Sequence, residues 1–408
     1  MHQPSIFSSF WLAGFESACH VTRNGARLDM MAATQHDRFV QDDYRRLRQV
    51  GITSVRDTVR WHLIERPEGH YDWSSLDPFI AAARAEGMQI TWDLCHYGLP
   101  DGLDLFAPEF VDRFARFSRA VALRLREETD EVQLFTPINE ISFFAWAAGE
   151  VGWFHPFGHG RGAEVKRQLI RACIASIEAI HDVDPRSRIV TVEPLIHVVP
   201  PKGKPDVNGA AAGYRNSQFE AWDMLSGALA PELGGKPDYL DVMGVNFYHD
   251  NQWEHPGGRK IAWHIHPRDA RWVPFHQLLH EAYSRYRRPI FVGETSHVGV
   301  GRAEWIRELT DELCLALDAG VPVEGICLYP IIDRFEWENP DHWHNSGLWD
   351  FEKDAAGVFK RVLNPEYASE LWHSQAKLAA KGYGTYPAFG APEMDSLAER
   401  GTDSGQPA

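Results

Sequence analysis

Two glutamates stand out because each directly follows a strongly apolar stretch of sequence. Glu140 ends the segment TPINE, and Glu294 lies within IFVGETS. A single glutamate of this kind would more often cap a helix or pair with an arginine. Two such glutamates at the ends of matching strands can divide a reaction between them. One protonates the leaving oxygen, while the other stabilises or attacks the anomeric carbon. The cleavage of a glycosidic bond requires both.

The elements that would position these glutamates recur along the chain as eight apolar, β-branched stretches separated by amphipathic segments. Eight strands that alternate with helices predict the α/β class and a single (β/α)8 TIM barrel. The stretches cover residues 9–18, 52–60, 88–97, 131–140, 188–198, 239–249, 289–299 and 323–333. Most of them end in polar or aromatic residues, such as Arg56, His96 and Tyr248. In such barrels, residues at the carboxyl ends of the strands form the active site.

The organisation along the chain predicts one catalytic barrel domain followed by a short tail. The barrel is expected over residues 1–388. Residues 389–408 are polar and rich in Gly and Pro, which is typical of disorder. The segment 199–236 is long for a connection and is expected to contain a helix that helps to wall the site, and residues 250–273 are expected to form another long loop.

Composition excludes several classes of function. The chain has 57 Asp and Glu against 41 Lys and Arg, a formal net charge of −16, which disfavours a nucleic-acid partner. The amino terminus has no signal-peptide pattern and no stretch suits a membrane span, so a cytoplasmic location is expected. The five cysteines are widely spaced and predict neither a disulfide framework nor a zinc site. The 20 histidines include no ligand set at a recognisable metal spacing, and we expect no metal and no cofactor.

Six short motifs, in order along residues 5–360, resemble those of glycoside hydrolase family 1, the β-glucosidase-like family of the retaining clan A. TPINE resembles the acid/base motif of that family, and FVGETS resembles its nucleophile motif. The other similar segments are SVRDTVRW with RPEG, DLCHYGLP, GVNFY, and LYPIIDRFEW with GLWDF. The resemblance implies a (β/α)8 barrel that hydrolyses O-glycosidic bonds by double displacement and binds a small glycoside or the end of an oligosaccharide. The oligomeric state is left open.

The resemblance also implies roles for individual residues. Glu140 would be the general acid/base and Glu294 the nucleophile. Arg56 and Tyr248 would hydrogen-bond Glu294, and Asn139 would bind the 2-hydroxyl of the sugar. The pKa of Glu140 should be raised by burial and by the charge of Glu294. The remaining sugar contacts would come from His96, Glu336 and Trp337.

Four positions in the sugar site depart from the family pattern, so the resemblance implies a divergent member of the family. His20 replaces a glutamine, Tyr97 and Tyr329 replace tryptophans, and Arg334 replaces an uncharged amide. These substituted side chains are still expected to bind substrate. Because they change the pattern of hydrogen-bond donors and acceptors, we expect a glycone other than plain glucose, either bulkier or acidic. Arg334 could instead pair with Asp333 or Asp57.

Two alternative functions remain open at the level of sequence. A transglycosidase would use the same two glutamates but pass the sugar to an acceptor other than water. A sugar-binding barrel without catalysis is disfavoured because Glu140 and Glu294 are both present.

Overall fold

The computed structural model describes residues 6–384, and its centre is a closed barrel of eight parallel strands. Around the barrel the strands follow the order β1, β10, β9, β7, β5, β4, β3, β2, and β2 pairs with β1 to close the sheet. The barrel strands are β1 (Trp11–Gly14), β2 (Ser54–Thr58), β3 (Gln89–Asp93), β4 (Leu134–Thr136), β5 (Arg188–Pro194), β7 (Val242–Asn246), β9 (Ile290–Thr295) and β10 (Val323–Leu328). The predicted (β/α)8 barrel is therefore confirmed.

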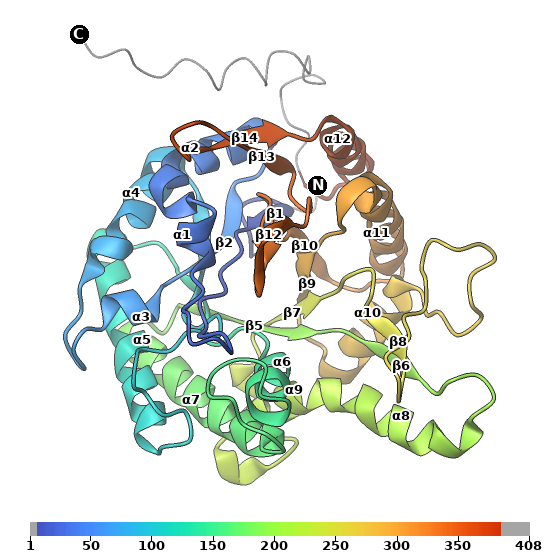
Figure 1. The fold of residues 1–408 in the computed structure, drawn as a ribbon, viewed down its shortest axis with the longest axis horizontal. Helices are drawn as coiled ribbons and strands as arrows, with labels where there is room; N and C mark the ends of the chain where they lie inside the picture. Colours follow the sequence, from blue (N-terminus) through green and yellow to red (C-terminus); the bar gives the residue numbers. More distant parts are fainter. Residues whose placement is uncertain (1–5, 385–408) are drawn as a thin grey trace.

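Helices form a ring outside the strands, as Figure 1 shows in a view along the barrel. Neighbouring helices pack in pairs, for example α5 against α7 and α11 against α12. The helices are α1 (Met30–Ala33), α2 (His36–Gln49), α3 (Trp61–Ile64), α4 (Asp77–Glu86), α5 (Glu109–Glu128), α6 (Ile141–Phe144), α7 (Gly162–Val183), α8 (Asn208–Asn216), α9 (Glu220–Leu225), α10 (Phe275–Tyr286), α11 (Arg302–Asp318) and α12 (Pro365–Ala380).

Each of the eight predicted stretches contains one barrel strand. All eight strands are shorter than the stretches that predicted them, because the residues at the carboxyl ends of the stretches continue into the loops of the barrel mouth. The segment 199–236 contains helices, α8 and α9, as expected. Figure 1 places α8 at the outer rim, where Arg215 pairs with Glu281 of α10, so this helix does not wall the barrel centre. The predicted tail over 389–408 lies outside the described residues.

Three two-stranded sheets lie outside the barrel in the described part of the chain. β6 (His197–Val199) and β8 (Gln252–Glu254) are parallel, and β8 interrupts the long loop expected over 250–273. β11 (Phe335–Glu336) pairs with β12 (Asn339–Trp343), and β13 (Trp349–Lys353) pairs with β14 (Phe359–Leu363). Both of these last sheets are antiparallel and follow the eighth barrel strand.

The interior of the barrel is filled by an apolar cluster that is separate from the core beneath the helices. Leu12, Val192 and Phe291 belong to it, as does the ring of Tyr329. A Cβ atom at Gly14 would collide with that ring, so only glycine lets Tyr329 lie across the end of β1. The close approach brings the tyrosine hydroxyl to the mouth of the barrel.

On the opposite face of β2, a buried charge network holds α2 to the barrel. His36 has no exposed surface, and its ring nitrogens lie 2.9 Å from Asp43 and 3.0 Å from Asp57. Arg361 of β14 also contacts Asp43 at 2.9 Å, and the Tyr44 hydroxyl donates to Asp57. Burial alone would lower the pKa of His36, but the charges of Asp57 and Asp43 outweigh burial and raise it.

Replacing His36 by glutamine should lower stability by about 3 kcal/mol near pH 6, because buried Asp57 loses its cationic partner while Asp43 keeps Arg361. A folded-state pKa above the unfolded value means that this contribution is fully present below about pH 6.5 and is lost as the pH rises through the raised pKa. Urea unfolding of wild type and variant at several pH values measures the difference. His70→Gln, at an exposed histidine, is the control. A difference that grows with pH would contradict the imidazolium assignment.

Candidate active site

The two glutamates lie at the carboxyl ends of β4 and β9, which are separated in the closed sheet by β5 and β7. Both are buried, with exposed fractions of 9% for Glu140 and 4% for Glu294. Glu140 has a left-handed backbone with φ of 45°, and its amide donates to the carbonyl of Val192 in β5. A non-glycine residue in this conformation is uncommon and is found mostly where surrounding contacts hold it.

Glu294 is held through both of its carboxyl oxygens. Arg56 of β2 donates from Nη1 to Oε1 at 3.0 Å, and the Tyr248 hydroxyl donates to Oε2 at 2.8 Å. The same Arg56 nitrogen also donates to the carbonyl of Gly293 at 2.8 Å. Arg56 and Tyr248 are the partners that the resemblance implies. A carboxylate held at two points has a fixed orientation toward the barrel mouth.

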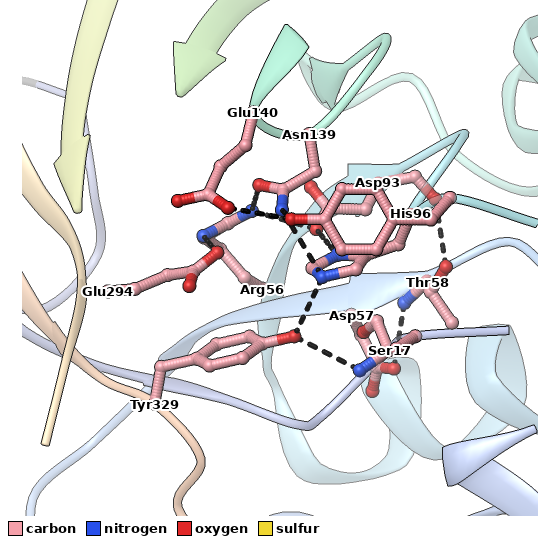
Figure 2. A network of polar contacts seen from close by, with 12 residues as sticks. Ser17, Arg56, Asp57, Thr58, Asp93, His96, Asn139, Glu140, Glu294 and Tyr329 are labelled. Atoms are coloured by element: carbon pink, nitrogen blue, oxygen red, sulfur yellow. Dashed lines mark hydrogen bonds and ion pairs between the residues drawn. The ribbon is translucent and has the colours of Figure 1, made fainter. Parts of the chain in front are cut away.

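Arg56 joins Glu294 to the last residue of β3 and to a residue that follows β4 (Figure 2). Its Nη2 donates to Asp93 at 2.8 Å and to Oδ1 of Asn139 at 2.9 Å, and the side chain is completely buried. Burial would lower the pKa of Arg56, but the charges of Asp93 and Glu294 raise it, so the guanidinium remains cationic. One arginine therefore links four strands of the barrel.

Glu140 has different surroundings, because both of its contacts are neutral donors. The Tyr97 hydroxyl donates to Oε2 at 2.7 Å, and Nδ2 of Asn246 donates to Oε1 at 2.8 Å. Burial and the negative charge of Glu294 raise the pKa of Glu140 to about 8, despite these two hydrogen bonds. The rise has the direction expected for a group that must start the reaction protonated.

His96, Asn139 and Tyr329 belong to the same network. His96 lies 3.2 Å from Asp93 through Nδ1 and 3.2 Å from Nδ2 of Asn139 through Nε2. Asn139 Nδ2 also donates to the Tyr97 hydroxyl at 3.0 Å. The Tyr329 hydroxyl lies 3.4 Å from His96 Nε2 and accepts from the amide of Ser17 (Figure 2). Both Asn139 amide hydrogens are therefore engaged inside the protein, and binding a sugar 2-hydroxyl would require an exchange of partners.

His20 and Trp337 form an aromatic side of the site. The His20 ring stacks on Phe154 with centroids 4.3 Å apart and meets Trp337 edge-on at 4.9 Å, and Trp337 lies 5.8 Å from Tyr97. Burial, with smaller contributions from His96 and Arg27, lowers the pKa of His20 to about 3, so its imidazole is neutral. His20 Nδ1 and Trp337 Nε1 are both buried and have no hydrogen-bond partner among the described residues.

Two expected sugar contacts are placed differently. The Glu336 side chain is half exposed on the β11–β12 hairpin and pairs with His342 at 3.2 Å, because this two-stranded sheet directs the residue to solvent. The Arg334 guanidinium lies over the Trp337 ring and forms its ion pair with buried Glu16, at 3.0 Å, and not with Asp333 or Asp57. The charge of Arg334 is thus already balanced within the protein.

Asn246, Asp93 and Glu16 are site residues that the sequence reasoning missed. Asn246 is the last residue of β7 and Asp93 the last of β3, while Glu16 follows β1 by two residues. All three are buried. The sequence signal that could have identified them is their position, because each is a polar residue near the carboxyl end of a predicted strand.

Two kinds of feature are absent from the described residues, a metal site and a membrane-spanning helix. Residues 6–384 contain no group of three or more His, Cys, Asp or Glu side chains that could hold a metal ion. Within the same range, none of the helices has the length and apolar character needed to cross a bilayer.

Comparison with protein families gives a partial match. The model of the beta-galactosidase family Glyco_hydro_42 matches residues 32–114. This segment includes Arg56, Asp93 and His96 but ends before either glutamate. The match therefore supports a glycoside hydrolase relationship, and the family it points to differs from the family 1 suggested by the motifs. Curated protein sequences give no significant match.

Solved structures give a match over almost the whole chain. The beta-glucosidase from Thermotoga maritima in complex with glucoimidazole has a TM-score of 0.72 at 16% identity, and the alignment covers 92% of this chain and 98% of that one. The same enzyme in complex with castanospermine has a TM-score of 0.71 at 18% identity with the same coverage. At these identities the match establishes the fold. The chain is a glycoside hydrolase-like (β/α)8 barrel.

Proposed function

We propose that the protein is a retaining β-glycosidase of clan A that acts on a small glycoside or the end of an oligosaccharide. The observation that carries the proposal is the contrast between the two buried carboxyl groups. Glu140 contacts neutral donors and has a pKa of about 8, whereas Glu294 contacts the Arg56 cation. At neutral pH this pair supplies a proton donor and a carboxylate at the same barrel mouth.

In the proposed first step, a Glu294 oxygen attacks the anomeric carbon while Glu140 gives its proton to the departing oxygen. The bond to the leaving group breaks as the bond to Glu294 forms. The glycosyl ester has no charge, so one of the causes that raise the pKa of Glu140 disappears. Glu140 can then remove a proton from the water that releases the sugar. This mechanism predicts about 5–5.5 Å between the two carboxyl groups.

The surroundings of the proposed sugar site favour an uncharged glycone. Arg334 is neutralised by Glu16, which removes the main reason to expect an acidic sugar. His20 Nδ1 and Trp337 Nε1 are hydrogen-bonding atoms without a partner among the described residues, whereas Glu336 is turned to solvent. Because this pattern differs from that expected for a glucose site, we propose that plain β-glucosides are poor substrates.

A panel of aryl β-glycosides should give release of the aryl group, and proton NMR should show the β-anomer as the first-formed sugar. Retention follows because two displacements occur at one carbon. The panel should include glucoside, galactoside, fucoside, xyloside and glucuronide, with kcat/KM compared across them. Added acceptor alcohols will reveal transfer by a change in product ratio. First appearance of the α-anomer would contradict retention, no release from any glycoside would favour a binding protein, and a clear preference for glucoside would contradict the proposed specificity.

A further inference from the structure

The side chain of Tyr97 is held in place by its backbone conformation and by aromatic packing on several sides. It follows β3, is 3% exposed, and has a left-handed backbone with φ of 68°. Its ring lies between Phe143, Phe144 and Phe154, with centroid distances of 5.4–5.5 Å. Packing on several sides leaves the hydroxyl one position, directly beside Glu140.

The direction of the hydrogen bonds at this hydroxyl follows from Arg56. A guanidinium can only donate, so the Asn139 atom that faces Arg56 must be the carbonyl oxygen. The Asn139 nitrogen therefore faces Tyr97 and donates to its oxygen at 3.0 Å. The single proton of the Tyr97 hydroxyl is then directed to Oε2 of Glu140, 2.7 Å away.

The other oxygen of Glu140 has a partner that can change its orientation. Asn246 donates to Oε1 from Nδ2, while its own Oδ1 is buried and has no hydrogen-bond partner within residues 6–384. A rotation of this amide by half a turn would present Oδ1 to Glu140 as an acceptor. Asn246 can therefore serve either a bare or a protonated Oε1, whereas Tyr97 can only donate to Oε2.

We propose that Tyr97 is a positioning residue that commits Oε2 of Glu140 to accepting a hydrogen bond, so that Oε1 carries the proton used in the reaction. This role of Tyr97 rests on the proposed function, and it determines which oxygen of the acid Glu140 carries the proton. In the first step the proton passes from Oε1 to the glycosidic oxygen. That oxygen keeps the electron pair of the bond to the anomeric carbon as this bond breaks and the bond to Glu294 forms. Oε1 is left as part of a carboxylate that again accepts from Asn246.

Removal of the hydroxyl has a predictable sign. A hydrogen bond from Tyr97 stabilises the charged form of Glu140 more than the neutral form, so its loss should raise the pKa of Glu140. A hydrogen bond to a charged group corresponds to a shift of about one pH unit. The pKa of Tyr97 itself is held well above its ordinary value, first by burial and then by the charge of Glu140, so its own titration does not overlap.

The test compares Tyr97→Phe with Tyr329→Phe, which removes a buried hydroxyl that contacts His96 and Ser17 but neither glutamate. The basic limb of kcat/KM for an aryl glycoside reports the acid of the free enzyme. It should move up by about one pH unit in Tyr97→Phe and stay in place in Tyr329→Phe.

A second measurement does not depend on turnover. NMR titration of protein labelled with ¹³C at the glutamate carboxyl carbons gives the pKa of Glu140 directly, with Glu140→Gln to assign the signal. An upward shift in Tyr97→Phe supports the inference even if no glycoside is cleaved, in which case the proposed function alone fails. An unchanged pKa of Glu140 in a folded Tyr97→Phe protein would overturn the positioning role.

Discussion

Replacing Glu294 by glutamine should lower kcat by about 10⁴-fold or more on every substrate, because the amide cannot form the covalent intermediate. Glutamine has nearly the same shape and can still accept a hydrogen bond from Arg56, so the barrel should remain folded. Initial rates on the best aryl glycoside measure the loss. The matched control is Glu131→Gln, which changes an exposed residue just before the amino end of β4 and should retain wild-type rates.

The nucleophile assignment can also be tested by chemical rescue. In Glu294→Ala, azide can occupy the space of the missing carboxylate and attack the anomeric carbon once, which would give an α-glycosyl azide. Substantial turnover by Glu294→Gln with natural leaving groups would show that another group attacks the sugar.

Replacing Glu140 by alanine should have an effect that depends on the leaving group. Substrates with poor leaving groups should lose about 10²–10⁴-fold in kcat/KM, because they need the proton that Glu140 supplies. Activated aryl glycosides need little acid assistance, so their first step should be nearly spared. A series of leaving groups of graded pKa measures this dependence as the slope of log kcat/KM.

Azide gives an independent check of the Glu140 assignment. In Glu140→Ala it should attack the glycosyl–enzyme from the side of the missing base and release a β-glycosyl azide. If the Glu140→Ala and Glu294→Ala variants respond identically on activated substrates, the two roles have been assigned wrongly.

The barrel could be predicted from sequence because its signal is local. Each strand lies in an apolar stretch, and most of the stretches end in polar or aromatic residues at the mouth. Glu140, Glu294, Arg56 and Tyr248 lie at such ends, and the structure brings them together. The contact of Arg56 with Asp93 was not predicted in the same way. Asp93 also lies at the end of a strand, but an acidic residue three positions before a histidine is not a distinctive sequence motif.

Other parts of the site depend on backbone geometry that sequence patterns do not encode. The hydrogen bond from the Tyr97 hydroxyl to Glu140 joins two residues that both have left-handed backbones. The outward position of Glu336 depends on the register of β11 with β12, because a shift of one residue reverses which face a side chain occupies. Arg334 meets Glu16 across more than 300 residues of chain, so no local pattern could pair them.

The position of Arg56 has a consequence for how the protein acquires its structure. Arg56 and Glu294 are 238 positions apart, and the strands that carry them lie on opposite sides of the β1–β10 segment that completes the ring. Contacts this distant in sequence form only after the entropy of closing a long loop has been overcome. The guanidinium therefore finds its last carboxylate partner when the first and last parts of the chain dock. Early collapsed states would contain an arginine and a glutamate that are still hydrated and separate, and the reactive geometry would arise together with closure of the barrel.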